Sequence, residues 1–509
     1  MKSRSLHYLS KTFCTLFLLL VLDSYLCLPS YSQAVVGVFS NDRSQDNFFY
    51  LPPTLSIDED QGKIYISNGD VVLVADTNTN TFIEKIDNAS TNFMITDGKN
   101  PLNTTGILIN DNKIYSLNTV TLNTIYVSNI ENNSAKITST IFLPAGFPLP
   151  ATPIPFLSNG NNSLALNPNS NKLYFSNFFN DHVDVVDISK NEYLSRIPLG
   201  EYFSSEYGTN PIAVNKKTNK VYVADFFTDS LVVINGSTNE VIKVLKLGYS
   251  QCTGNTLIRG GCGLQGIAIN EILNKVYLVY SNGPGIFIID GNSDEKETFI
   301  KIEGEVEKLG SIAVNENTGF IYALGKDVYT NKLFVIDSNS NKVKKVIRVG
   351  LKPERLVVSS KKGKVFVVDN IFTPISVFVV DEQKNEQEQP FTKNLFIKLL
   401  DSFKQSVDDF ASQANKLTVT RDLNAIGESI LKVKSWFESG QSTCNNDLLM
   451  EGKTVNKRIE SIRRTYRNKC NSGKRLNFCN NFTKHFSNIN NYYNVIELVP
   501  SLHLCDSSY

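Results

Sequence analysis

A repeated phrase of strand-like segments runs through the middle of this chain of 509 residues. Its clearest copy spans 211–248 and contains Ile-Ala-Val-Asn, a polar turn, Lys-Val-Tyr-Val-Ala, a loop, Leu-Val-Val-Ile-Asn and an apolar run that ends in Leu-Gly. Further copies cover 164–200, 266–304 and 311–350. Tandem units of this length, made of short apolar strands, are typical of a β-propeller.

The number of units can be counted on the apolar strand that follows the polar turn. Seven positions align at its start: Ile64, Ile114, Leu173, Val221, Val276, Ile321 and Val365. The inner strands are almost entirely apolar, as expected for strands packed on both faces, whereas the outer strands alternate. The sequence therefore predicts a mainly β protein, a seven-bladed β-propeller with four-stranded antiparallel blades, followed by a small α-helical domain.

The last blade lacks a fourth strand in its own sequence. A polar run at 381–389 stands where that strand should be, and an unassigned apolar segment lies at 35–39. A closed ring removes exposed sheet edges, and blades otherwise contact only their neighbours. We therefore expect 35–39 to pair with blade seven and close the ring.

The turns of the repeat carry polar residues that recur from unit to unit, and these residues have two interpretations. Asparagine precedes lysine at Asn219-Lys220 and Asn274-Lys275, and asparagine tolerates a left-handed backbone in hairpin turns. Aspartate ends the third strand at Asp187, Asp290, Asp337 and Asp381. Metal ligation is one interpretation. Because these residues recur once per blade around a ring, the sequence favours hydrogen bonds to the backbone.

These strands resemble those of the YVTN family of β-propellers. Tyr-Val-Ala-Asp at 222–225 stands where that family has its name-giving strand, and Ser-Leu-Val-Val-Ile at 230–234 matches its third strand. The resemblance is strong over 164–350 and fades through 35–160. It implies a seven-bladed propeller that is often secreted or attached to the cell surface, and it implies no shared catalytic residues.

The N-terminus predicts a secretory signal peptide at 1–34. Lys2, Arg4 and Lys11 form a positive region, and the apolar run at 12–22 is shorter than the roughly 20 residues that span a bilayer. Small residues precede an expected cleavage after Ala34. We therefore expect a secreted, extracellular or cell-surface protein with no membrane segment after cleavage, a propeller at 35–385 and a helical domain at 386–509.

Six cysteines remain after the signal peptide, and an even number in an exported protein favours disulfides. Cys252 and Cys262 flank a short glycine-rich loop and are predicted to pair. The C-terminal four lie in a segment with helical spacing, in which a bridge within one long helical interval would have to span up to about 39 Å. Antiparallel helices would instead join the pairs Cys444–Cys505 and Cys470–Cys479.

The helical spacing defines four amphipathic segments after residue 390. The first three carry the apolar positions Phe396, Leu400, Phe403, Val407 and Phe410, then Leu423, Ile426, Ile430, Val433 and Phe437, then Val455, Ile459, Ile462 and Tyr466. The fourth lies near 478–493. These stripes predict a small helical core.

Ligand-binding residues are expected on the propeller face that carries the loops between second and third strands. Two such loops hold aromatic pairs, Phe178-Phe179 and Phe226-Phe227, and Arg259 lies inside the cysteine-flanked loop. The pairs could form a platform for a protein, peptide or glycan, or pack against the next blade. Arg259 could grip a carboxylate or phosphate, or remain solvated.

The third C-terminal helix is strongly basic. Its cations are Lys457, Arg458, Arg463, Arg464 and Arg467. This face could bind an anionic partner, or be a solvated helix surface. Nucleic acid is not an expected partner, because the chain has a net charge of only +1 and no recognition motif.

Motifs of known enzymes are absent from the sequence, and no cofactor or metal site is predicted. His182 is expected in a blade loop at the surface. We expect a binding or scaffolding protein. Two alternatives remain: a propeller hydrolase or lyase with dispersed acidic residues, with or without Ca²⁺, at the channel mouth, or an accessory subunit of an envelope complex. Oligomeric state does not follow from the sequence.

Overall fold

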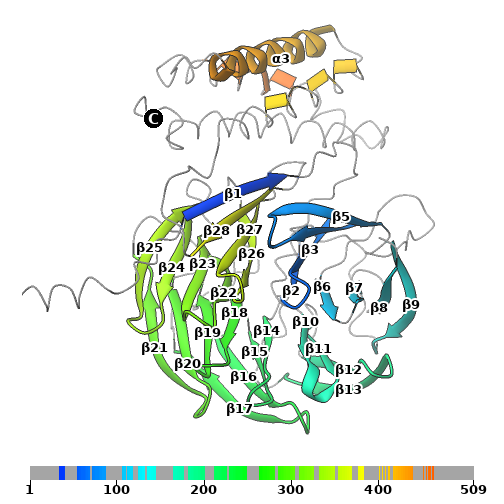
Figure 1. Cartoon of the computed structure of the whole chain (residues 1–509), viewed down its shortest axis with the longest axis vertical. Helices are drawn as coiled ribbons and strands as arrows, with labels where there is room; N and C mark the ends of the chain where they lie inside the picture. The colour runs from blue at the N-terminus through cyan, green and yellow to red at the C-terminus, as the bar shows by residue number, and fades with distance from the viewer. Residues whose placement is uncertain are drawn as a thin grey trace, which may run out of the picture.

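Strands β1 to β28 form seven four-stranded blades in the computed structural model (Figure 1). The structure describes residues 34–40, 54–68, 71–87, 106–110, 112–118, 124–131, 134–144, 164–176, 182–200, 211–225, 229–248, 263–280, 285–303, 309–325, 332–349, 353–369 and 376–382 of the propeller, and 400–401, 404, 407–408, 411–412, 417–438, 451, 454–455, 457–459 and 461–462 beyond it.

The first four blades follow one another along the chain. Blade one contains β2 (Leu55–Asp58), β3 (Lys63–Asn68), β4 (Val71–Asp76) and β5 (Thr81–Asp87), and blade two contains β6 (Gly106–Asn110), β7 (Lys113–Asn118), β8 (Thr124–Glu131) and β9 (Ser134–Phe142). Blade three contains β10 (Leu164–Asn167), the 3-10 turn η1 (Pro168–Ser170), β11 (Lys172–Ser176), β12 (His182–Asp187) and β13 (Glu192–Pro198). Blade four contains β14 (Ile212–Asn215), β15 (Lys220–Ala224), β16 (Ser230–Asn235) and β17 (Val241–Lys246).

The remaining blades complete the ring. Blade five contains β18 (Leu264–Asn270), β19 (Lys275–Tyr280), β20 (Gly285–Asp290) and β21 (Glu295–Lys301), and blade six contains β22 (Leu309–Val314), β23 (Phe320–Gly325), β24 (Lys332–Asp337) and β25 (Lys342–Arg348). Blade seven contains β26 (Pro353–Ser359), β27 (Lys364–Asp369), β28 (Ser376–Asp381) and, from the other end of the chain, β1 (Ala34–Ser40). The predicted fold class is confirmed.

The ring is closed at both its inner and outer circumference. The first strand of every blade contacts the first strand of the next, in the order β2, β6, β10, β14, β18, β22, β26 and back to β2. At the outer edge, β1 pairs antiparallel with β28 from Ala34 opposite Asp381 to Ser40 opposite Ser376. The prediction that 35–39 closes the last blade is therefore confirmed.

The hydrophobic core consists of clusters that lie between neighbouring blades. One cluster joins blades three and four through residues such as Tyr174, Val185 and Val221, and another joins blades five and six through Tyr277 and Phe334. Full burial of such a side chain contributes about 1.5–3 kcal/mol. Because each cluster needs both blades, the stability of every blade depends on its neighbours.

The turn between first and second strands has a residue with left-handed backbone at its last position in all seven blades. These residues are Gly62, Asn112, Asn171, Asn219, Asn274, Gly319 and Gly363, with φ between 52° and 73°. The carbonyl of each accepts a hydrogen bond of 2.8–3.2 Å from a backbone N–H at the end of the third strand. The donor is the residue directly after that strand, except in blade two, where it is Ile130 within the strand. The predicted role of asparagine at these turns is confirmed.

The turn between third and fourth strands is held by the side chain that ends the third strand. Asp290 Oδ1 accepts hydrogen bonds from the backbone N–H of Asn292 at 3.0 Å and of Ser293 at 2.8 Å. Asp187 makes the same bonds to Ser189 and Lys190. Hydrogen bonding favours the ionised form and lowers the pKa of both carboxyls. The aspartates thus bind the backbone, as the sequence favoured.

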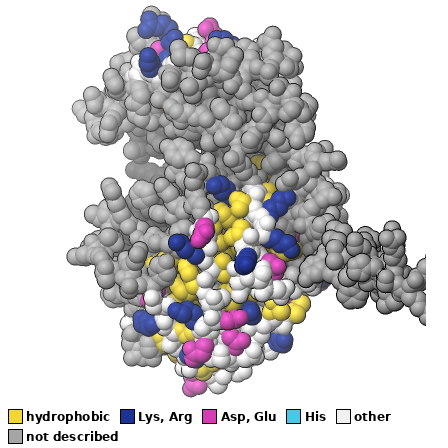
Figure 2. All heavy atoms as spheres, turned by 90° about the vertical axis from the view of Figure 1, so that its left-hand side faces the viewer, with side chains coloured by type: hydrophobic (Ala, Val, Ile, Leu, Met, Phe, Trp, Pro, Cys, Tyr) yellow, Lys and Arg dark blue, Asp and Glu magenta, His cyan; other side chains and the backbone are white. Residues whose placement is uncertain are grey.

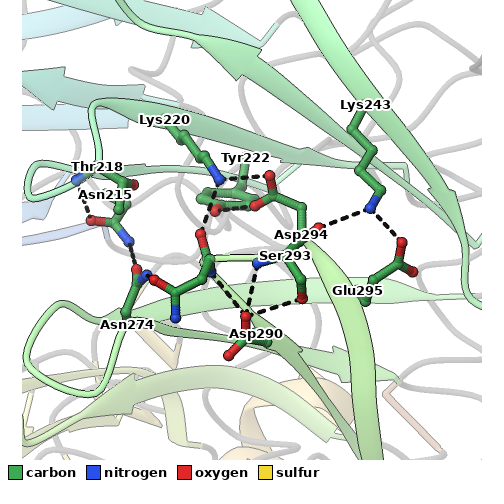
Figure 3. Close-up of polar contacts among 12 residues, drawn as sticks. Asn215, Thr218, Lys220, Tyr222, Lys243, Asn274, Asp290, Ser293, Asp294 and Glu295 are labelled. Carbon is green, nitrogen blue, oxygen red and sulfur yellow. Dashed lines mark hydrogen bonds and ion pairs between the residues drawn. The ribbon is translucent and has the colours of Figure 1, made fainter.

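Polar side chains from one blade reach the turn of the next (Figure 3). Lys220 Nζ donates to Gly291 O at 3.0 Å and to Asp294 Oδ2 at 2.6 Å. Tyr222 donates its hydroxyl proton to Asp294 Oδ1 at 2.7 Å. At the same interface, Asn215 Nδ2 donates to Asn274 Oδ1 at 2.7 Å. These bonds fix the angle between blades four and five.

The interface between blades six and seven replaces this set with one carboxylate. Glu382, which is 1% exposed, accepts a hydrogen bond from the hydroxyl of Tyr322 and another from Asn315 Nδ2 at 2.9 Å. Blade six has Phe320 where blade four has Lys220, so no lysine of that position shares the carboxylate. Burial and the nearby Glu382 raise the pKa of Tyr322.

The outer strands are shaped against edge-to-edge association. All six fourth strands that follow their own third strand have a register shift near the turn. Figure 2 shows the side where β21, β24 and β25 lie in Figure 1, with hydrophobic side chains interleaved among charged ones. Bulges and charges on edge strands oppose pairing with other sheets.

Helices follow the propeller, as expected. Helix α3 (Leu417–Glu438) is the long one, and helical residues also occur within 400–412 and 451–462. The predicted apolar positions for which the structure gives the burial are all buried: Leu400, Val407, Leu423, Ile426, Ile430, Val433, Val455, Ile459 and Ile462. None of the described helices is both long and apolar enough to cross a membrane.

Replacement of Glu382 tests the interface between blades six and seven. Glu382→Ala removes the carboxylate that accepts hydrogen bonds from Tyr322 and Asn315 in a buried interface, so we expect the free energy of unfolding to fall by about 3 kcal/mol. Urea unfolding followed by fluorescence measures this change. Glu295→Ala removes a carboxylate whose side chain is 66% exposed, and its loss should cost less than about 1 kcal/mol. Equal effects of the two substitutions would contradict the assignment.

Buried tyrosines on the second strands predict that the protein loses stability in alkali. Burial raises the pKa of Tyr65, Tyr174 and Tyr277 to about 12. A raised folded-state pKa stabilises the protein below about pH 10, and this contribution is lost as the pH rises from about 10 to 12, at up to about 1.4 kcal/mol per pH unit for each tyrosine. Urea unfolding at several alkaline pH values checks this, and Tyr277→Phe should reduce the slope. A slope that Tyr277→Phe leaves unchanged would refute it.

Candidate functional site

The two faces of the propeller differ in their connections. We call the face with the turns from first to second and from third to fourth strands the turn face, and the opposite one the loop face. On the turn face each connection has at most five residues. On the loop face lie the loops from second to third strands and the links between blades, which include 88–105, 143–163, 199–211 and 247–263. The long connections are therefore concentrated on the loop face.

All five predicted ligand-binding residues of the propeller fall in connections that start and end on the loop face. Phe178 and Phe179 lie between β11 and β12, Phe226 and Phe227 between β15 and β16, and Arg259 between β17 and β18. These five residues lie outside the described part of the chain. Because blades three and four are adjacent in the ring, the two aromatic loops leave from neighbouring blades.

A charged cluster around a buried aspartate lies on β12 and β13 of blade three. Asp184 on β12 is 1% exposed, and its two oxygens face different partners. Oδ1 accepts from Arg196 Nε at 3.0 Å and from the hydroxyl of Tyr193 at 3.3 Å, and Oδ2 lies 3.2 Å from His182 Nε2. Burial, followed by the charge of Asp184, raises the pKa of Tyr193. We call these four residues the Asp184 cluster.

The expected position of His182 was wrong. His182 is the first residue of β12 rather than a loop residue, and it is only 6% exposed. Its ring is buried, and its Nε2 lies 3.2 Å from Oδ2 of Asp184.

The Asp184 cluster is specific to blade three. Asp184 pairs with Phe175, the fourth residue of the second strand. In all six other blades the residue that pairs at this position is a buried nonpolar or aromatic residue: Leu73, Tyr126, Val232, Phe287, Phe334 and Phe378. A buried ion cluster is often no more stable than well-packed hydrophobic residues of similar volume. The propeller framework therefore does not require this cluster, which points to a role at the loop face.

The Asp184 cluster holds the ends of two loop-face connections. Arg196 Nη2 donates to the carbonyl of Pro144 at 2.7 Å, and Pro144 directly precedes the long segment 145–163 between blades two and three. His182 directly follows the loop with the first aromatic pair. The same carboxylate thus orients both chain ends.

The second aromatic loop also has a fixed base. The backbone N–H of Asp225 donates to Ser230 O at 2.9 Å, and Lys246 Nζ donates to Ser230 Oγ at 2.6 Å. Leu247 N donates to Asp229 O at 3.1 Å. These contacts tie β15, β16 and β17 together where the loop leaves the blade.

Buried charged residues also lie at the start of blade seven. Arg355 is 6% exposed, and its Nη1 donates to Glu354 O at 3.0 Å. Burial lowers the pKa of Arg355 to about 10, against the attraction of Glu354. Within the described residues, no group of three His, Cys, Asp or Glu side chains is placed to hold a metal ion.

The described part of the basic C-terminal helix contains Lys457 and Arg458. Lys457 is exposed, whereas Arg458 is half-buried and its Nη1 lies 3.3 Å from Asp422 Oδ1 of α3. Arg458 therefore bonds within the protein. Outside the described residues lie Arg463, Arg464, Arg467 and the six cysteines of the predicted disulfides.

The Asp184 cluster was missed from the sequence, although a signal existed. The third strand of blade three reads His-Val-Asp-Val-Val-Asp, whereas that of blade four reads Ser-Leu-Val-Val-Ile-Asn. A charged residue at an apolar position of a repeat marks a departure from the framework. Arg196 and Tyr193 lie on the following strand, so only the pairing of β12 with β13 reveals the full cluster.

No family model matches this chain, and no curated protein matches it. Hydrazine synthase from Kuenenia stuttgartiensis is one solved structure with a similar fold. It is 11% identical, with a TM-score of 0.48, and the match covers 66% of this chain and 98% of that one. This likeness carries no argument about function.

Substitutions in the Asp184 cluster separate a structural requirement from a functional one. Asp184→Ala alone removes the carboxylate that His182, Tyr193 and Arg196 share, and should cost about 1–3 kcal/mol of stability. The triple variant His182→Ser, Asp184→Val, Arg196→Val copies blade four and should be as stable as the natural protein or more so. Thermal and urea unfolding measure both. A triple variant that is less stable than Asp184→Ala would contradict the comparison between blades.

Proposed function

We propose that this chain is an exported binding protein that holds a protein, peptide or glycan ligand on the loop face of blades three and four. The propeller is a rigid ring, and its fold supports a binding or scaffolding role in general. The observation that carries the proposal is the Asp184 cluster, a buried charged group that the framework does not need and that fixes loop ends at this face.

The aromatic pairs supply the contact surface in this proposal. Phe178-Phe179 and Phe226-Phe227 occupy equivalent loops of adjacent blades, so the two pairs can meet one ligand. Aromatic side chains stack on sugar rings and fill pockets of peptides with little loss of rotamer entropy. Arg259 adds a cation for a ligand carboxylate.

The proposal includes the export signal, the disulfides and the YVTN-type repeat. The signal peptide and an extracellular or cell-surface location agree with an even number of cysteines in 35–509. The pairs Cys252–Cys262, Cys444–Cys505 and Cys470–Cys479 would then form on export. N-terminal sequencing of the exported protein should find Val35 first, and a protein retained whole in the cell would refute this part.

The binding experiment uses the full chain on arrays of glycans and peptides. Bound ligands are then titrated against Phe178→Ala/Phe179→Ala and Phe226→Ala/Phe227→Ala. Each double variant should weaken binding at least tenfold, because aromatic residues at interface centres commonly contribute more than about 1 kcal/mol. Phe142→Ala is the matched control, since Phe142 is 66% exposed on the outer strand β9. Binding that both loop variants leave unchanged would refute the proposed site.

A further inference from the structure

The first turn of blade five carries an exposed aliphatic pair on the turn face. Ile272 is 58% exposed and Leu273 is 39% exposed. In the other turns of this length the same two positions hold polar residues: Asp60-Gln61, Asn169-Ser170, Lys217-Thr218, Asn317-Thr318 and Lys361-Lys362. Six turns share one geometry, so the turn itself does not require apolar side chains.

This turn is held in one conformation. The backbone N–H of Leu273 donates to Asn270 Oδ1 at 2.8 Å. Asn274 is left-handed, with φ of 53°, and its carbonyl accepts from Gly291 N at 2.8 Å. A surface whose backbone is already fixed loses little conformational entropy when a partner binds.

A lysine lies on one side of the aliphatic pair and a glutamate lies on the other. On the blade-four side, Lys217 is exposed and its Nζ lies 3.4 Å from Ile272 O. On the blade-six side lies Glu316, which is partly buried. Burial and the neighbouring Glu271 raise the pKa of Glu316. The charge of Lys216 acts on this carboxylate in the opposite direction, so Glu316 is a partly buried carboxylate between a glutamate and a lysine.

We propose that two copies of this chain associate through their turn faces, on a two-fold axis along the radius that passes through the first turn of blade five. Rotation about this radius places blade four of one copy over blade six of the other. Lys217 of each copy then meets Glu316 of the second copy, and the two aliphatic pairs meet each other.

The second copy is favoured as the partner because the surface is complementary to itself. A two-fold contact requires that each feature and its counterpart lie on opposite sides of the axis. The order of lysine, aliphatic pair and glutamate across three successive turns satisfies this requirement. The loop face remains free in such a dimer, so the inference does not depend on the proposed ligand site.

Sedimentation velocity of the full chain tests the proposal up to roughly 100 µM, because interfaces with few apolar anchors are commonly weak. Ile272→Asn/Leu273→Thr copies the Asn317-Thr318 turn of blade six and should weaken dimerisation at least tenfold. Ile242→Asn is the matched control, since Ile242 is 48% exposed on the outer strand β17. The control should leave the dimer unchanged.

A charge exchange tests the two-fold geometry. Lys217→Glu should weaken the dimer at least tenfold, and the double variant Lys217→Glu/Glu316→Lys should restore it, because the exchanged charges again meet across the axis. Circular dichroism confirms that each variant is folded. A chain that stays monomeric throughout the concentration range, or a dimer that none of these substitutions weakens, would overturn the proposal. A dimer that the double variant fails to restore would overturn the two-fold arrangement.

Discussion

One backbone hydrogen bond, repeated in all seven blades, holds the architecture together on the turn face. In this bond, a backbone N–H at the end of the third strand donates to the carbonyl of the left-handed residue in the turn between the first and second strands. The bond fixes two hairpins of one blade against each other, so the side chains that reach the next blade start from a fixed position. Only then can Lys220 and Tyr222 reach Asp294 of the next blade. The polar ties between blades depend on this local bond.

The framework tolerates changes in side chains as long as the hydrogen-bonding groups stay satisfied. Between blades four and five, an asparagine and an aspartate accept the bonds from Asn215 and Tyr222. Between blades six and seven, Glu382 alone accepts the equivalent bonds from Asn315 and Tyr322. Buried polar groups need partners, but which residue supplies the partner is open. This freedom explains how blade three can carry a charged cluster without loss of the fold.

The fold was predictable because its signals are periodic and local. Apolar alternation, left-handed asparagines and third-strand aspartates each recur in every blade or nearly so, and even the closing strand followed from a missing element at 381–389. The Asp184 cluster was not predictable as a unit, because Asp184, Arg196 and Pro144 come from two blades and meet only in the folded ring. His182 was misplaced because one polar residue at a strand start looks like a loop residue. The aliphatic pair on the turn face needed exposure to be recognised.

The closing pair of strands also has a consequence for the order of synthesis. β1 leaves the ribosome first, yet its partner β28 is made more than three hundred residues later. Until then β1 has no strand to pair with in its final sheet. The entropy lost on joining such distant segments grows only slowly with their separation, whereas the search for the correct register is slow for contacts of long range. Completion of the disc therefore waits until β28 has been made, so the ring becomes whole later than its first six blades.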